Sequence, residues 1–154
     1  MKAVTHTGTL TLLLLLCAAL LSAATSCIAM AQTGVDDVRS STQAFARMLP
    51  GYTHDQRTEL VEASRDILER VDDSISELDA RMRSDWHTMS ESSKLEVQNA
   101  MTELKIQRLI VAEGTGALGH VSVEAWSMVK EDFSASFVQL QSSWEIAIKT
   151  LNSQ

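Results

Sequence analysis

Apolar residues recur at steps of three and four positions along most of this chain, and that spacing constrains its fold more than any other feature. A helix turns once every ~3.6 residues, so side chains at this spacing lie on one face. The sequence has a single proline and few β-branched runs, which argues against a β-sandwich or barrel. The pattern therefore predicts an all-α fold. One long stripe contains Leu60, Ile67, Val71, Ile75, Leu78, Met82, Trp86 and Met89.

Turn and capping residues divide the pattern. Residues 32–52 are expected to form a short N-terminal helix and turn, because Pro50 and Gly51 cannot continue a helix. Thr53 and Gln56 then have the spacing of a capping box, which predicts a helix start at 53. Acids precede arginines by four residues on the polar face of this helix, at Asp66–Arg70, Glu77–Arg81 and Asp79–Arg83. This order stabilises a helix.

A helical coiled-coil domain is expected over residues 53–154, with helices over about 53–113 and 122–152. The stripe loosens near 90–93, where Ser93 and Glu96 could form a second capping box, but a continuous or gently kinked helix is slightly favoured. Beyond it the stripe resumes, and Ile106, Leu109 and Ile110 are expected to widen it. Gly114 to Gly119 holds three glycines, which predicts a turn. Ser122 is placed to cap the last helix.

The simplest assembly of these helices is an antiparallel hairpin or a three-helix coiled-coil bundle. Heptad spacing favours left-handed packing at about +20°. The helix that starts at Thr53 either completes the bundle within one chain or extends beyond the hairpin and needs a partner chain.

The first 31 residues have the features of a secretory signal peptide. Lys2 is their only charge, a dense apolar stretch follows from Leu10 to Leu21, and Ala29-Met30-Ala31 offers a cleavage site. The expected location is therefore periplasmic or secreted. Two alternatives would attach the chain to a membrane, namely a retained leader or acylation of Cys27. Both cysteines lie in this segment, so no disulfide is expected after cleavage.

The charge of the remaining chain limits its partners. The full sequence has a net charge of −7, and without the leader, whose only charge is Lys2, it is −8. No basic stripe is present to neutralise phosphates, so nucleic-acid and anionic-membrane binding are not expected.

No catalytic residue, metal site or cofactor is predicted. The histidines at 54, 87 and 120 lack the spacing of a zinc site and are expected at solvated positions. Met82, Trp86, His87 and Met89 supply soft ligands that could hold Cu(I), but Met82, Trp86 and Met89 lie on the apolar stripe and are expected in the core.

The last helix holds the candidate interaction face. Its apolar residues either fill the bundle interior or form an exposed surface that binds a client protein, a lipid surface or a second copy of the chain. The expected partner is a protein or the chain itself. The residues of this face are Trp126, Phe133, Phe137, Leu140 and Trp144.

Two resemblances bear on function. The segment Ser122-Val-Glu124-Ala125-Trp126, followed by Asp132-Phe133, resembles the closing helix of small exported bacterial coiled-coil proteins. Members of that group are stress-associated, with poorly defined function, which implies a non-enzymatic envelope role for this chain.

The second resemblance is more local. Tyr52-Thr53-His54-Asp55-Gln56 is similar to the Leu-Thr-x-x-Gln motif of periplasmic chaperones and stress sensors of the Spy and CpxP type. It implies, as an alternative, an α-helical protein that binds clients on an apolar helix face.

Overall fold

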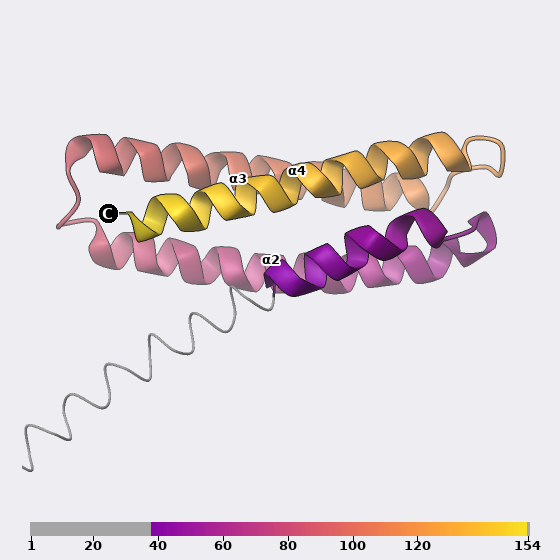
Figure 1. The fold of residues 1–154 in the computed structure, drawn as a ribbon, viewed down its shortest axis with the longest axis horizontal. Helices are drawn as coiled ribbons and strands as arrows, with labels where there is room; N and C mark the ends of the chain where they lie inside the picture. The colour runs from indigo at the N-terminus through magenta and orange to yellow at the C-terminus, as the bar shows by residue number, and fades with distance from the viewer. Residues whose placement is uncertain (1–37, 154) are drawn as a thin grey trace, which may run out of the picture. The chain divides into compact units, whose positions relative to one another are not determined.

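The computed structural model describes residues 38–153, and this part of the chain consists of helices and the turns that join them (Figure 1). A helix covers residues 38–48, followed by two 3-10 turns, η1 (Leu49–Gly51) and η2 (His54–Gln56). Three long helices then follow, α2 (Arg57–Asp85), α3 (Glu91–Leu118) and α4 (Trp126–Asn152). The predicted leader, residues 1–31, lies outside the described residues. No helix within 38–153 is long and apolar enough to cross a membrane.

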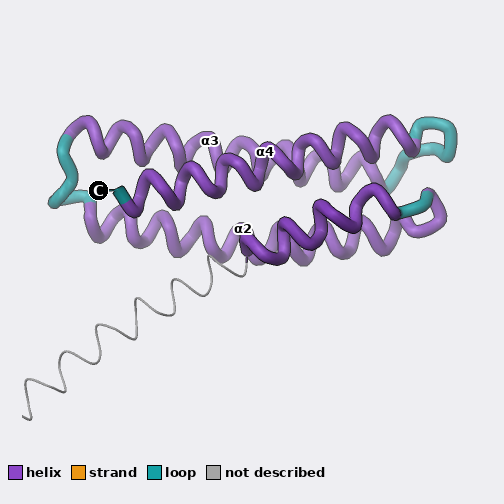
Figure 2. The backbone as a smooth tube through the Cα atoms, in the orientation of Figure 1, coloured by secondary structure: helices purple, strands orange, loops and turns teal. Residues whose placement is uncertain are grey.

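Successive helices run antiparallel, so the described residues form an up-and-down bundle (Figure 2). The helix over 38–48 lies beside α4, where Phe45 contacts the rings of Phe133 and Phe137. Since α3 also packs against both α2 and α4, all four helices share one core. The all-α prediction is confirmed. The short helix expected within residues 32–52 is present over 38–48, and the predicted 53–113 helix is two helices, so the bundle has four helices in the described residues.

The core follows the predicted stripes of α2 and α4 closely. Their buried side chains recur at steps of three and four residues, as the heptad pattern requires. Buried Ser64 and Thr115 each donate a hydrogen bond to the carbonyl four residues earlier, at 2.7 and 2.8 Å, which satisfies their hydroxyls inside the helix. The most completely buried large side chains are Trp144, Phe45, Phe137, Leu49, Leu60, Leu104, Leu118 and Leu140.

The chain reverses direction at residues 86–90, so the slightly favoured continuous helix is not present. Ser90 begins α3, with its Oγ accepting a hydrogen bond from the Ser93 amide at 3.1 Å. An extended residue whose hydroxyl satisfies a first-turn amide is a typical N-cap. The serine that caps is thus Ser90, three positions before the predicted Ser93.

Residues 114–119 also differ from the prediction, because α3 continues through Gly114 and Gly116 to Leu118. The turn comes later, at residues 119–125. A Cβ on Gly114 would lie 2.9 Å from Cδ2 of Phe133, so this glycine lets α3 and α4 approach closely. Gly116 has open space around it.

Candidate functional site

The predicted interaction face of α4 lies inside the bundle. Trp126 is 7% exposed and Phe133, Phe137, Leu140 and Trp144 are each 2% exposed or less. Within the described chain, the buried indole nitrogen of Trp144 has no hydrogen-bond partner, so apolar packing alone holds that ring. These side chains fill the core, which is the first of the two interpretations given above. The exposed surface that the second interpretation needs is therefore absent at these five residues.

Trp126 instead helps to join the two connections at one end of the bundle. Its indole Nε1 donates to Tyr52 O at 3.3 Å, and Lys130 Nζ donates to the carbonyls of Pro50 and Tyr52, both at 2.8 Å. The His54 ring packs edge-on against Trp126, with Nε2 lying 3.1 Å from Val121 O. The predicted capping box contributes, since Gln56 Oε1 accepts a hydrogen bond from the Thr53 amide at 3.1 Å.

Glu124 belongs to the same end of the molecule. Hydrogen bonds from its own backbone amide and from the Ser122 hydroxyl hold the pKa of its carboxyl below the ordinary value, with a smaller contribution from nearby His54. Ser122 Oγ also accepts from the Ala125 amide at 3.4 Å, just before α4 begins. These contacts fix the turn that precedes α4.

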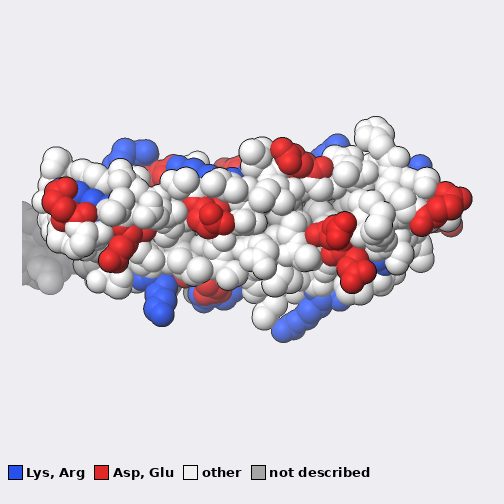
Figure 3. All heavy atoms as spheres, turned by 90° about the horizontal axis from the view of Figure 1, so that it is seen from above, with Lys and Arg blue, Asp and Glu red and all other residues white. Residues whose placement is uncertain are grey.

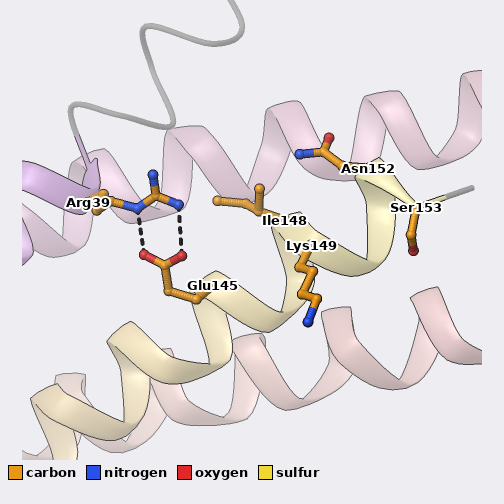
Figure 4. A pocket seen from close by; sticks show the side chains of 6 residues that line it. All are labelled: Arg39, Glu145, Ile148, Lys149, Asn152 and Ser153. Carbon is orange, nitrogen blue, oxygen red and sulfur yellow. Dashed lines mark hydrogen bonds and ion pairs between the residues drawn. The ribbon is translucent and has the colours of Figure 1, made fainter.

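A surface depression of about 500 Å³ lies beside the C-terminal part of α4 (Figure 4). Its main polar feature is the pair between Arg39 and Glu145, in which Nε and Nη2 donate to the two carboxylate oxygens at 2.5 and 2.7 Å. Because the two charges neutralise each other, the pair joins helix 38–48 to α4 rather than presenting a charge to a ligand. The other lining residues are Ile148, Lys149, Asn152 and Ser153.

A second depression, about 360 Å³, lies between α2 and α3. There Arg108 donates both Nε and Nη2 to the carboxylate of Asp72. This pair also links two helices.

The four residues considered for copper have different surroundings. Met89 is buried, Met82 and Trp86 are half-buried, and His87 is exposed. Lys94 Nζ lies 5.5 Å from the centre of the Trp86 ring, so a cation occupies the vicinity of that indole. Residues 38–153 contain no group of three or more histidine and acidic side chains arranged to hold a metal ion.

Exposed apolar side chains are concentrated on α3 and α4. Ile106, Leu109 and Ile110, expected to widen the core stripe, are 46%, 55% and 41% exposed. The described part of α2 has no large exposed apolar side chain. We define the α3–α4 face as the large apolar residues of these two helices that are exposed: Leu95, Ile106, Leu109, Ile110, Met128, Val138 and Ile146.

Charged residues are distributed in the opposite way to exposed apolar residues, because they are most frequent on α2. Charged residues make up 14 of the 29 positions of α2 but only 5 of the 27 positions of α4. Figure 3, which looks onto α3 and α4, shows a surface that is mostly uncharged, with acidic side chains standing on it and basic ones mainly near its edges. The bundle therefore has one side typical of a solvated helix and one side that is unusually apolar.

A signal for this face exists in the sequence. Each helical residue advances by about 100°, so a residue two positions from a core residue points away from the core. On α3 and α4 these positions include Ile106, Leu109 and Ile146, whereas on α2 they include Glu62, Glu69 and Asp73. If every apolar residue of a helix is assigned to one wide buried stripe, all of them are expected in the core. The difference between the outward positions of α2 and those of α3 and α4 is then missed.

The chain was compared with protein-family models, with curated proteins and with solved structures, and none of the three comparisons gives a match.

Proposed function

We propose that this chain is an exported, non-enzymatic helical protein that acts through protein contacts on the α3–α4 face, as a structural or stress-associated component of the cell envelope. The single observation that carries the proposal is the position of the large exposed apolar side chains, most of which lie on α3 and α4 and none on α2. An apolar surface of this kind is typical of a protein interaction site. The leader-like residues 1–31 support export.

Site-specific photo-crosslinking in living cells tests this proposal. A photoreactive amino acid replaces Ile110 on the α3–α4 face, and a matched variant carries it at Asp73, which points outward from α2. Both positions are exposed, so neither change disturbs the core. We expect a discrete crosslinked protein species from position 110 and none from position 73. Equal crosslinking from both positions, or none from either, would contradict the proposal.

Client binding of the chaperone type is the second candidate, supported by the same exposed residues and by the Thr53–Gln56 motif. It predicts that the protein slows aggregation of an unfolded client and that Ile106→Ser with Ile110→Ser reduces this effect. The same assay with Met48→Ser is the control, because Met48 is exposed but lies on the helix over residues 38–48. A chaperone would also give many crosslinked species from position 110 rather than one.

A further inference from the structure

We infer that the partner of the α3–α4 face is a cationic amphipathic helix of another protein, with an apolar stripe flanked by lysine or arginine. This inference rests on the proposed function and adds the chemistry of the partner. It follows from the spacing of the exposed apolar residues and from the charges around them.

The apolar residues of α3 have the spacing that a docked helix needs. Ile106, Leu109 and Ile110 stand at positions i, i+3 and i+4, and Leu95 lies on the same side of the helix three turns earlier. At ~1.5 Å per residue, Leu95 and Ile110 are about 22 Å apart along the axis. A partner helix of about four turns would cover this length, with its own anchors at matching steps.

The charges beside these residues are acidic and unpaired. Glu103 and Glu113 on α3 and Glu131 on α4 are exposed, and none of them forms an ion pair with another residue of the 38–153 segment. Glu113 and Glu131 each lie two positions from a core residue, Val111 and Phe133, and so point outward with the apolar side chains.

The basic residues of α3 cannot compensate for these acids. Lys105 Nζ binds Asp79 of α2 at 2.7 Å, and Arg108 binds Asp72 of α2, so both cations are turned toward α2. Lys94 pairs with Glu91 at 2.6 Å. On α4, Lys149 is exposed and forms no ion pair within residues 38–153, but the acids Glu103, Glu113 and Glu131 outnumber it. The net charge left unpaired on the α3–α4 face is therefore negative, which attracts a cationic partner and repels an anionic one.

The same charges disfavour the other occupants. A second copy would place its own unpaired carboxylates against these, and juxtaposed like charges reduce affinity. A bilayer surface with anionic lipids would be repelled, because helices that lie on such surfaces carry Lys and Arg on their polar faces.

Fluorescence anisotropy with a labelled 21-residue peptide tests the inference. The peptide has Leu at the two apolar heptad positions and Lys elsewhere, and a matched peptide has Glu in place of Lys. The full-length chain is the binding protein. We expect the Lys peptide to bind and the Glu peptide not to bind.

Two pairs of variants locate the binding. Ile106→Ser with Ile110→Ser should weaken binding of the Lys peptide about tenfold or more, since central apolar anchors dominate an interface, while Met48→Ser should leave binding unchanged.

Glu113→Gln with Glu131→Gln should weaken binding of the Lys peptide about threefold at low salt, which is the size of effect expected for exposed ion pairs. Glu62→Gln with Glu69→Gln removes the same charge from outward positions of α2 and should have no effect. All of these positions are exposed, and circular dichroism checks that each variant keeps its helices.

Four results would overturn the inference. Equal weakening by the α2 pair would mean diffuse attraction to an acidic protein, and equal binding of the Glu peptide would mean that charge does not select the partner. A dimer in sedimentation that Ile110→Ser dissociates would mean that a second copy covers the face. If the Lys peptide does not bind but position 110 gives a crosslink, a cationic helix is not the partner, and the proposed contact surface still holds. If position 110 gives no crosslink, the proposed contact surface is itself wrong.

Discussion

Gly114 sets how closely α3 and α4 approach each other. The ring of Phe133 lies 2.9 Å from the position that a Cβ on this residue would take, and that ring is itself held against Phe45 and Phe137 at centroid distances of 6.4 and 5.8 Å. Phe133 is 2% exposed, so the ring has little room to move. A glycine two residues later, Gly116, faces open space and supplies a matched comparison in the same helix.

We expect Gly114→Ala to destabilise the protein and Gly116→Ala to stabilise it. The added methyl at 114 forces the packed ring to shift, which costs about 1–3 kcal/mol. Over most of its range this cost is larger than the ~1 kcal/mol by which Ala is better than Gly inside a helix. At 116 only the helix term acts, so the gain is about 0.5–1 kcal/mol. Urea unfolding followed by circular dichroism measures both, and equal effects of the two substitutions would show that the ring does not restrict position 114.

The contact between Gly114 and Phe133 also explains why the glycine-rich segment is misread from sequence. Three glycines in six residues are typical of a turn, and the partner that makes Gly114 useful inside a helix lies on another element. Local spacing carries no information about such a neighbour. The one glycine that does coincide with a turn is Gly119, which follows the last residue of α3.

At the scale of the elements, Ser90 decides where α3 begins. Its Oγ accepts from the Ser93 amide, one of the first-turn donors that have no partner within the helix. Ser92 and Ser93 lie close enough for the three hydroxyls to hydrogen-bond, with both distances from Ser90 Oγ at 2.9 Å. Several serines in this segment could cap a helix by their residue type. Ser90 is the cap because the chain reverses direction at residues 86–90 and α3 begins directly after it.

Ser90→Ala should therefore lower the free energy of unfolding by about 1 kcal/mol, the usual cost of losing an N-cap. Ser93→Ala should lower the free energy of unfolding by less. The backbone amide of residue 93 still donates its hydrogen bond to Ser90 Oγ in this variant, and only the contact between the two hydroxyls is lost. Thermal or urea unfolding compares the two variants. If Ser93→Ala is the more harmful change, the helix starts at the residue predicted from the capping-box spacing instead.

Ion pairs between elements are the second feature that local spacing does not show. The four-residue spacing predicts a pair between Asp79 and Arg83, but Asp79 binds Lys105 on α3, and Arg81 pairs with Asp85 at 3.8 Å. A side chain on the flank of a helix reaches its neighbour as easily as the next turn. Spacing along one helix therefore identifies residues able to pair without identifying the pairs.

At the scale of the whole molecule, the helix over residues 38–48 is part of the common core. Phe45 and Leu49 are 1% exposed or less, and the Phe45 ring lies 4.8 Å from that of Phe137 on α4. A short helix that places such side chains in the centre of the bundle should unfold together with the other three.

We expect Phe45→Ala to lower the free energy of unfolding by about 3–5 kcal/mol, the cost of a large cavity in a core. Met48→Ala, on the exposed side of the same helix, should cost far less. Circular dichroism and tryptophan fluorescence should report the same transition in both variants. A separate early transition in the wild-type protein, or a small effect of Phe45→Ala, would show that this helix is not part of the cooperative unit.

The fold class could be predicted from the sequence, whereas the site could not. Heptad spacing requires helices with one buried face, and the residues of α2 from Leu60 to Leu78 and of α4 from Trp126 to Leu151 occupy that face as expected. Large aromatic residues are the natural candidates for a binding surface when only the sequence is considered, yet burying them is what stabilises the bundle most. The surface that remains is made of aliphatic residues such as Ile106 and Leu109, whose role depends on the direction in which they point.

The hydrogen bonds from Trp126 and Lys130 to the 49–56 connection have a consequence for the dynamics of the bundle. They join the two connections at one end, whereas the other end has the single connection at 86–90 and the last turn of α4. Local opening should therefore begin at that second end, with the helices separating about the joined end as about a hinge. In native-state amide exchange, the protons of the last turns of α4 should be replaced by deuterium well before those around Trp126.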